Sequence, residues 1–387
     1  MTADARRDVV IVGGGPVGAA LALALDDGEC SVLLAEARGG PSREDDPRTL
    51  ALSFGSRLIL ERLGVWGEIA PVTPIESIHV SHRGAFGRAV LAATETGVAA
   101  LGYVVSYAAL RSALNSRLQR ALNVTLLPDS RAGQLAAGLD SVCVQFEDNA
   151  ARRAVHSRLL VIADGGATSQ AVTRVTVRDY GQSAIVANVS ASHPHLNRAF
   201  ERFTPEGPLA LLPREGGFAL VWTTGPESAQ LLCSLPAGTF LMRLQAAFGG
   251  RVGSFTGVEK RAAFPLALRV AEPPAVARTI LLGNAAQTLH PVAGQGLNLG
   301  LRDAWELAEC VRAHHGDPGC SAVLAAYSGR RRGDRSSGVF LTDALVHVFS
   351  NDRLLLRWLR GCGLTFLDCL PPVKRAFMHQ MMFGRPF

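Results

Sequence analysis

The 387-residue sequence lacks the patterns that mark several common classes of protein. No run of about eighteen or more uncharged apolar residues occurs, so no membrane-spanning helix is predicted. The start, MTADARRDVVIVGGG, has no apolar centre of the kind found in signal peptides. The seven cysteines include no Cys-x-x-Cys pair, so neither a zinc ribbon nor a disulfide framework is indicated. We expect reduced thiols and a cytoplasmic protein.

Other absences narrow the function. Charged residues make up only 19% of the chain, and apart from the segment 330–335 its arginines are scattered, which argues against nucleic-acid binding. The histidines at 193, 195, 314 and 315 lack acidic or cysteine partners at ligand spacing, so no metal site is predicted. No Gly-x-Ser-x-Gly motif is present, which argues against a serine hydrolase.

Apolar residues and glycine are abundant instead. Hydrophobic residues make up 48% of the chain and glycine occurs 40 times, which indicates a compact α/β enzyme. The length favours two domains over one.

A glycine-rich turn lies near the start of the chain. The apolar run 9–12 leads into Gly13, Gly15 and Gly18, spaced as Gly-x-Gly-x-x-Gly, and a second apolar run ends at Glu36. Glycines let the backbone approach a pyrophosphate at a helix N-terminus, and an acid after the second strand can bind an adenosine ribose. The pattern predicts a βαβ unit that binds a dinucleotide, and it leaves NAD and FAD open.

Further periodicities outline the rest of the chain. Short apolar runs at 159–163 and 279–282 predict two more buried strands of the same sheet. Alternation between residues 180 and 265 predicts an antiparallel sheet inserted as a second domain. An apolar stripe from Leu297 predicts a helix, and the apolar section from Val339 predicts two or three short helices, interrupted at 361–363 and 371–372.

The segment GNAAQTLHPVAGQGLNLG, residues 283–300, decides between the two dinucleotides. Gly294 and Gly296 remove Cβ atoms where a flat ring would lie against backbone, and a helix beginning near Gly296 would point its positive end at the ring. A reduced flavin carries negative charge on that side, so this helix would stabilise it. Asn284, at the end of a strand, is placed to bind a ribityl hydroxyl. The segment therefore favours FAD.

The blocks GGGPVG, ADGGATS and GNAAQTLHPVAGQGLNLG are similar to those of the class A flavoprotein aromatic hydroxylases, the para-hydroxybenzoate hydroxylase type. Within that group the chain most resembles the ubiquinone-biosynthesis branch. Matching stretches such as DPRTLALSFGSRLILERLGVW, FERFTPEGPLALLP and DALVHVFSN extend the resemblance over most of the chain.

The resemblance implies an α/β fold: a Rossmann-like FAD-binding domain with an inserted antiparallel substrate sheet and C-terminal helices. The expected division assigns residues 1–72, 101–178 and 269–335 to the FAD-binding domain, 73–100 and 179–268 to the substrate domain, and 336–387 to a helical segment.

The resemblance also implies roles for individual residues. His290 and Pro291 are expected at the front of the flavin, as the catalytic face. The residues expected to bind the cofactor are Gly13, Gly15, Gly18, Glu36, Arg48, Arg111, Asp164, Gly165, Gly283, Asn284, Gly294, Gln295, Gly296 and Asn298.

One segment departs from the family pattern. Where the family usually has Glu-Asn followed by an arginine, this chain has Ser106, Tyr107 and Ser112. The neighbouring Arg111 is the candidate to reach the pyrophosphate instead.

The reaction implied by the resemblance consumes NAD(P)H and O2. NAD(P)H reduces FAD, and the reduced flavin forms a C4a-hydroperoxide that hydroxylates an electron-rich phenol. Water must be kept out, so apolar walls are expected. The candidates on the inserted sheet are Leu211, Leu212, Pro213 and Trp222. His290 is the only candidate base.

The substrate implied by the resemblance is a phenol with a polyprenyl tail. The C-terminal apolar segment, with Arg353, Arg357 and Arg360, either rests on the inner face of an anionic membrane, alongside other quinone-biosynthesis proteins, or covers the core of the FAD-binding domain.

Competing hypotheses are a hydroxylase of a small soluble aromatic compound and a non-catalytic FAD-binding scaffold. A flavin-dependent reductase or halogenase is disfavoured, since the halogenase motif Trp-x-Trp-x-Ile-Pro is absent.

Overall fold

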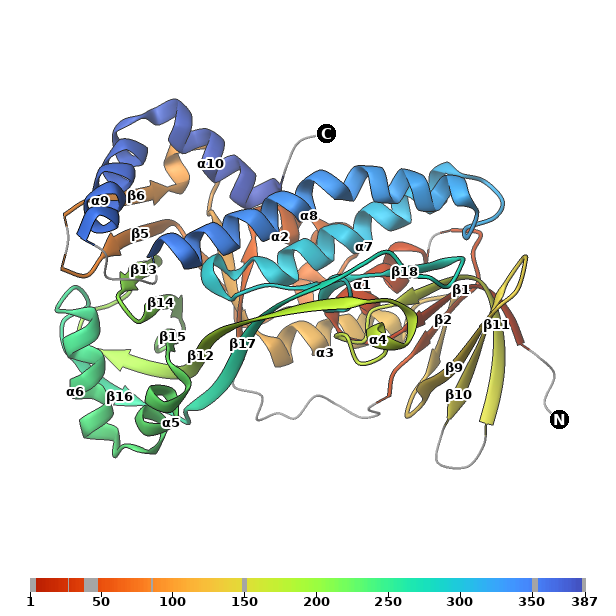
Figure 1. Ribbon diagram of the computed structural model, residues 1–387, viewed down its shortest axis with the longest axis horizontal. Helices are drawn as coiled ribbons and strands as arrows, with labels where there is room; N and C mark the ends of the chain where they lie inside the picture. Colours follow the sequence, from red (N-terminus) through yellow and green to blue (C-terminus); the bar gives the residue numbers. More distant parts are fainter. Residues whose placement is uncertain are drawn as a thin grey trace.

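The computed structural model describes residues 5–26, 28–37, 48–84, 86–147, 152–349 and 354–384. Two sheets lie toward opposite ends of the molecule, and long strands and helices run between them (Figure 1).

A seven-stranded sheet forms around the predicted βαβ unit. Strand β1 lies parallel to both β2 and β11. Val9 and Ile11 pack on one face of the sheet and Val10 and Val12 on the other, which explains the continuous apolar run. The strand order is β8-β2-β1-β11-β10-β9, and β18 pairs with the end of β11. The strands are β1 (Ala5–Val12), β2 (Val32–Ala35), β8 (Val124–Leu127), β9 (Arg131–Ala137), β10 (Val142–Glu147), β11 (Arg152–Ile162) and β18 (Thr279–Leu281).

Helices α1 (Pro16–Ala24) and α7 (Gln295–Ala313) pack together beside this sheet. Glycine permits the close contact, because a Cβ at Gly300 would lie 2.6 Å from Cγ2 of Val17. Other helices of this region are α2 (Phe54–Arg62), α3 (Tyr107–Leu118), the short α4 (Ser169–Val172) and α8 (Ser321–Phe349).

The arginine-rich segment of α8 is partly internal, because Arg331 and Arg335 pair with α7, whereas Arg330 and Arg332 are exposed. Arg331 is 2% exposed and lies 2.6 Å from Asp303 of α7, and Arg335 lies 3.3 Å from the same carboxylate. The cluster of arginines in the sequence therefore forms an ion-pair network between α7 and α8.

A nine-stranded sheet forms the other end of the molecule. Its order is β19-β17-β12-β15-β14-β13-β5-β6, with β16 on β12. Strand β5 pairs parallel with β13, which brings residues near 80 beside residues near 200. The strands are β5 (Ser77–His82), β6 (Arg88–Ala92), β12 (Val175–Ala191), β13 (Arg198–Thr204), β14 (Gly207–Arg214), β15 (Gly217–Thr224), β16 (Phe255–Val258), β17 (Ala262–Ala271) and β19 (Gln287–Thr288).

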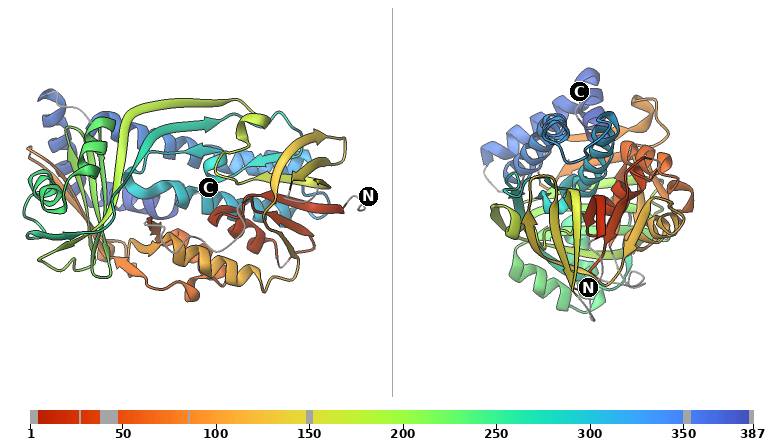
Figure 2. Two further views of the ribbon diagram at one scale, coloured as in Figure 1. Left: turned by 90° about the horizontal axis from the view of Figure 1, so that it is seen from below. Right: turned by 90° about the vertical axis from the view of Figure 1, so that its right-hand side faces the viewer.

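Two helices that the sequence analysis did not predict, α5 (Pro226–Ser234) and α6 (Ala237–Phe248), cover one face of this sheet. Figure 2 shows the long strands β12 and β17 extending from this sheet toward the opposite end of the molecule. A small sheet of β3 (Thr49–Ser53), β7 (Gly102–Ser106) and β4 (Thr73–Ile75) completes the strands. The predicted α/β class with a large antiparallel sheet is confirmed.

The C-terminal prediction needs correction. Helix α8 begins at Ser321 and runs through the expected boundary at 335/336, and α9 (Leu354–Cys369) runs uninterrupted through residues 361–363. Position 361 favours glycine because a Cβ there would lie 2.7 Å from the backbone oxygen of Phe86. Only the break at 371–372 is as predicted, where α10 (Pro371–Phe383) begins.

Candidate functional site

One large cavity lies between the two sheets, with a volume of about 1390 Å³. Pockets for a single drug-sized ligand usually measure roughly 300–1,000 Å³, so this cavity has room for a cofactor and a substrate together. Its lining includes β1, β3, β13, β14, the N-terminus of α7 and the C-terminal helices α9 and α10.

The predicted glycine turn forms one end of the cavity. Gly13 has φ +109, and its missing Cβ lets β11 approach, since a Cβ would lie 2.6 Å from Ala163. A Cβ at Gly18 would lie 2.0 Å from the Gly13 oxygen, so Gly18 serves packing and does not line the cavity. Gly15 caps α1 and lines the cavity, and no atom of the described residues lies within 4 Å of where a Cβ would be. The open space beside a helix N-terminus suits a phosphate.

Glu36 lies at this same end of the cavity. Its Oε2 accepts a hydrogen bond of 3.0 Å from the backbone N–H of Gly14 and lies 4.0 Å from Nη2 of Arg111. The Nε of Arg111 is buried and has no hydrogen-bond partner among the described residues. A guanidinium whose Nε finds no partner among the described residues, beside the glycine turn, suits an anionic ligand, which supports the role that the sequence suggested for Arg111.

The segment that departs from the family pattern, residues 106–112, also contributes to the cavity lining. Ser106 caps α3 by accepting from the N–H of Ala109, and Tyr107 lies under Arg48, whose guanidinium carbon is 3.9 Å from the ring centroid. Arg48 and Tyr107 both line the cavity. The altered residues therefore keep the helix cap and position Arg48 by a cation–π contact.

Asp164 and Gly165 follow β11 and line the cavity beside the turn, since a Cβ at Gly13 would lie 2.7 Å from Cα of Asp164. The Asp164 carboxylate accepts hydrogen bonds from the N–H groups of Gly166 and Thr168 and from the Thr168 hydroxyl. Gly165 has φ +76. The carboxylate thus holds a tight loop whose backbone faces the cavity.

The segment 283–298 forms the middle of the cavity. Gly283, Asn284, Gly294, Gln295 and Gly296 all line it. Gly294 has φ +60 and precedes α7, and a Cβ at Gly296 would meet no protein atom within 4 Å. The helix therefore begins at the cavity, and its first turn leaves open space in front of it.

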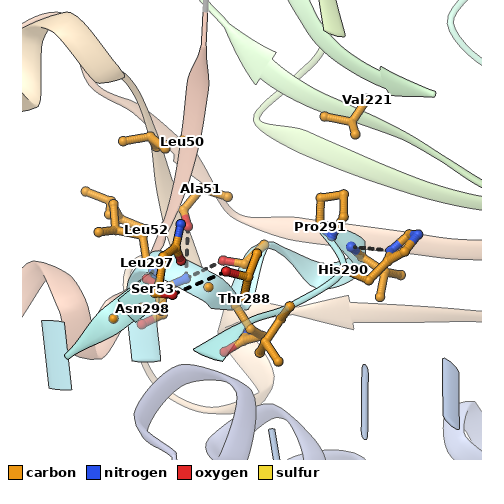
Figure 3. Close-up of a pocket in the computed structure, with 18 of the residues that line it drawn as sticks. Leu50, Ala51, Leu52, Ser53, Val221, Thr288, His290, Pro291, Leu297 and Asn298 are labelled. Atoms are coloured by element: carbon orange, nitrogen blue, oxygen red, sulfur yellow. Dashed lines mark hydrogen bonds between the residues drawn. The ribbon is translucent and has the colours of Figure 1, made fainter. Parts of the chain in front are cut away.

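Asn298 differs from expectation. Its Oδ1 accepts from the N–H of Ser53, and its Nδ2 donates to the oxygen of Ala51 (Figure 3). The same Oδ1 also accepts from the hydroxyl of Ser56, and the Nδ2 also donates to the oxygen of Gly294. All the bonds of this amide are made within the protein. Asn298 lines the cavity but holds β3 against α7 instead of offering its amide to a ligand.

His290 and Pro291 line the cavity between β19 and α7 (Figure 3). His290 is 1% exposed, its Nδ1 accepts from the N–H of Val292, and the edge of the Tyr180 ring packs near it, with centroids 5.3 Å apart. Burial lowers the pKa of His290 to about 4. The side chain is therefore neutral near pH 7 and too weakly basic for the base role that the sequence suggested.

The inserted sheet supplies the opposite wall, and two predicted substrate residues are misplaced. Leu212 lines the cavity, but Pro213 and Trp222 do not. Side chains alternate along a strand, so Leu211 and Trp222 point to the other face, where Trp222 packs against Phe240 of α6 at 5.9 Å between centroids. Their strand neighbours Ala210 and Val221 line the cavity instead.

Sequence reasoning also missed Glu201. Its side chain lines the cavity from β13, within the motif FERFT, whose alternation places Ala199, Glu201 and Phe203 on one face. The available sequence signal was an acidic residue, Glu201, between the apolar Ala199 and Phe203 on one face of the strand.

The C-terminal helices line the far end of the cavity. The residues of α9 and α10 that line it are Leu359, Arg360, Gly363, Leu364, Leu367, Phe377, Met378, Met381 and Met382. Arg360 is 3% exposed, and its Nη1 lies 2.9 Å from Nε2 of His82, so it does not face an external surface as one hypothesis required. Arg353 and the Arg357 side chain lie outside the described residues.

Across the described ranges, no three His, Cys, Asp or Glu side chains are grouped as metal ligands would be. No helix in the described part of the chain has the length and apolar character needed to cross a bilayer.

These residues fit a flavin adenine dinucleotide. Open space at Gly15 and Gly296, the unsatisfied Arg111 and the starts of two helices all occur along one cavity. An extended, doubly charged pyrophosphate with a flat ring at one end needs this combination.

Comparisons with known proteins agree. The profile of a family described as an FAD binding domain matches residues 6–336. The chain is 35% identical to the ubiquinone hydroxylase UbiL of Rhodospirillum rubrum, over 98% of this chain and 90% of that protein. It is 31% identical to the 3-demethoxyubiquinol 3-hydroxylase of Escherichia coli, over 95% and 96% of the two chains.

Among solved structures, the p-nitrophenol 4-monooxygenase PnpA of Pseudomonas putida matches with a TM-score of 0.80, covering 99% of this chain and 100% of that one at 19% identity. At that identity the likeness concerns the fold. Together with the glycine turn and the cavity, the family match shows that the chain belongs to the FAD-binding class A flavoprotein monooxygenases.

Proposed function

We propose that this FAD-dependent monooxygenase hydroxylates a polyprenylated phenol in ubiquinone biosynthesis, with NAD(P)H as electron donor and O2 as oxygen source. The proposal follows from one observation above all: the cavity continues from the dinucleotide end, past His290 and Pro291, to an apolar end lined by α9 and α10. The names of the relatives from Rhodospirillum rubrum and Escherichia coli support the pathway.

Bound FAD would supply the activated oxygen. The chain's share is to hold the dinucleotide and to shield the reacting ring. Gly15, Arg111 and Glu36 would bind its adenosine and pyrophosphate end, and the backbone of residues 294–296 would seat the ring. Val80, Ala210 and Val221 would exclude water from the substrate side.

The apolar end favours a lipid substrate over a small soluble aromatic compound. A soluble acid would need a closed pocket with a cation for its carboxylate. Here the far end is lined by leucines, methionines and a phenylalanine, and the cation there, Arg360, lies against His82. Leu359, 57% exposed, also lines the cavity, so the cavity reaches the protein surface at α9.

Purified enzyme with FAD tests the proposal directly. We expect a 2-prenyl-6-methoxyphenol to accelerate flavin reduction by NADPH or NADH and to be recovered with one added oxygen atom from ¹⁸O2. Faster turnover of short, tail-free phenols would favour the soluble-substrate alternative. Flavin binding without any phenol-stimulated reduction would favour the non-catalytic scaffold.

Complementation separates the ring positions. Strains that each lack one quinone-ring hydroxylase would receive this gene, and the accumulated intermediates would be identified by mass spectrometry. We expect rescue of quinone synthesis in at least one strain, and the rescued strain identifies the position.

A further inference from the structure

Where β5, β6, β13, β14 and β15 form the cavity wall, the described residues that line it are apolar except for Glu201. Glu201 on β13 pairs in register with Val80 of β5 and Ala210 of β14, and Ala210 pairs with Val221 of β15. All four residues line the cavity. One carboxyl group thus lies in the middle of a row of small apolar side chains.

One oxygen of this carboxyl group is a buried polar atom that the described residues leave unsatisfied. Its Oε1 is buried and has no hydrogen-bond partner among the described residues. Leaving a buried carboxylate oxygen unsatisfied is costly, so such a group in a ligand cavity is expected to meet a donor from the ligand.

The carboxyl group also lies near the predicted front of the flavin. Phe203, two residues along the same face of β13, and Val80, the partner of Glu201 on β5, form one cluster with Val292. Val292 directly follows Pro291, which lines the cavity. A substrate ring in front of Pro291 would therefore lie against the part of the sheet that carries Glu201.

From this placement we propose that Glu201 is a catalytic residue that accepts the hydrogen bond, and then the proton, of the substrate's phenolic hydroxyl. The proposal rests on the proposed function, because it requires a phenol in this cavity. Glu201 takes the place of His290 as the candidate base, because the buried imidazole of His290 is too weakly basic.

The step is a simple proton transfer. The phenolic O–H bond breaks, the proton passes to a carboxylate oxygen of Glu201, and the electron pair stays on the substrate oxygen, where it makes the ring a stronger nucleophile. When the hydroxylated ring carbon loses its own proton to water, Glu201 returns the stored proton to the product's oxygen.

The charge state of Glu201 suits this task. Burial raises the pKa of its carboxyl to about 7, so the accepting form predominates above that pH. The other ionisable side chains that line the cavity are Glu36, Arg48, Tyr107, Arg111, Arg131, Asp164, His290 and Arg360. His82 of β5 pairs in register with Phe203 and contacts Arg360. His79 of β5 and Arg202 of β13 point to the face of the sheet away from the cavity, because side chains alternate along a strand.

A binding experiment on the FAD-loaded enzyme tests the proposal without turnover. The probes are a 2-prenyl-6-methoxyphenol and its methyl ether, which has the same tail but no proton to give. We expect wild-type enzyme to prefer the phenol by roughly 10- to 100-fold at pH 8, as charged hydrogen bonds typically give. The preference should fall several-fold at pH 6, where Glu201 is largely protonated.

The matched variants are Glu201→Gln, Glu201→Asp and, as a control, Glu215→Gln in the turn between β14 and β15. We expect Glu201→Gln to lower the preference below roughly threefold and to remove its pH dependence, Glu201→Asp to restore part of it, and the control to change neither. Flavin content and thermal unfolding report whether each variant is folded.

The outcomes are distinguishable. Equal affinities of wild-type enzyme for phenol and ether at every pH, with the phenol still hydroxylated, would overturn the role of Glu201 and leave the proposed function standing. Absence of binding and hydroxylation of either probe would overturn both. If the glutamine variant does not fold, the pH dependence of the wild-type preference decides.

Discussion

At the scale of single residues, the glycines that the sequence predicted to bind the cofactor fall into two kinds. Gly13 and Gly18 are small because protein backbone lies where a Cβ would be, whereas Gly15 and Gly296 border open space. Only the glycines that border open space directly indicate a ligand-binding site. Sequence spacing alone cannot separate the two, because the distinction depends on what the rest of the fold places next to each glycine.

Gly15→Val should remove the flavin without unfolding the protein. The backbone of Gly15 has φ −67 and ψ 176, which valine adopts readily, and no protein atom obstructs the side chain. We expect flavin content below roughly a tenth of wild type, since a loss of about 1.4 kcal/mol in binding is tenfold. Visible absorbance of the purified protein and its far-UV spectrum check this. Gly18→Val is the contrast, and there the fold itself should be damaged. A yellow Gly15→Val protein would contradict the assignment.

Glu201 should also make stability depend on pH. Burial raises the pKa of its carboxyl from 4.5 to about 7 in the folded state, so the unfolded chain releases this proton at lower pH. The folded state then loses stability, relative to Glu201→Gln, as pH rises from about 4.5 to about 7. Urea unfolding of both flavin-loaded proteins at pH 5 and pH 8 measures the difference. An identical difference at both pH values would show that the carboxyl is not buried in this way.

At the scale of elements, the two faces of β15 have separate tasks. Val221 faces the cavity, and Trp222 packs under α6. Trp222 was expected from the sequence to face the substrate, but its neighbour Val221 does, because successive side chains of a strand point to opposite faces.

This division predicts opposite effects for neighbouring substitutions. Trp222→Ala should cost about 3–5 kcal/mol of unfolding free energy, as other buried aromatic truncations do, with the substrate's KM changed little. Val221→Phe should leave stability nearly intact and raise KM or lower kcat by narrowing the cavity. Denaturant unfolding and steady-state kinetics of the two variants provide the comparison. Reversed effects would mean that β15 has the other face toward the cavity.

The α7–α8 contact depends on buried charge. Arg331, which contacts Asp303 and Asp334 at 2.6 and 2.7 Å, is 2% exposed, whereas Arg330 beside it pairs with Glu306 and is 44% exposed. We expect Arg331→Ala to cost up to about 3–5 kcal/mol, since it removes the cation shared by two buried carboxylates, of which Asp303 keeps its ion pair with Arg335 and Asp334 its ion pair with Arg302. Arg330→Ala should cost less than about 1 kcal/mol. Urea unfolding of the FAD-loaded variants, compared at one pH, measures both losses, and similar losses would argue against an internal network.

At the scale of the whole molecule, the cavity reaches the surface beside an apolar patch on α9. We define this patch as Phe86, Trp358, Leu359 and Phe366, which are 46%, 65%, 57% and 58% exposed. The rings of Phe86 and Trp358 lie 5.1 Å apart. Because Leu359 both belongs to the patch and lines the cavity, a bilayer in contact with the patch would let a lipid tail enter directly.

The α9 patch should therefore bind membranes. Replacing Trp358 and Phe366 together by serine should weaken binding to vesicles with anionic lipid by at least about tenfold, because each aromatic contributes apolar area. Leu139→Ser is the control, since Leu139 is 97% exposed between β9 and β10, at the opposite end of the molecule from α9 (Figure 1). Vesicle sedimentation measures the binding. Equal loss in both variants would remove the case for a specific contact at α9.

Local pattern by itself determined the βαβ unit, the glycine turn, the start of α7 and the class of cofactor, because each depends on neighbours within about twenty residues of chain. The tertiary structure decided which side chains face the cavity. Glu201, Val221 and the lining of α9 face one cavity only because β13, β14 and β15 lie side by side and α9 folds back over β6. The alternation of residues around Glu201 could have shown a carboxyl group on an apolar strand face. Contacts between residues more than a hundred positions apart leave no local period, so only the placed strands show that this face lines the cavity.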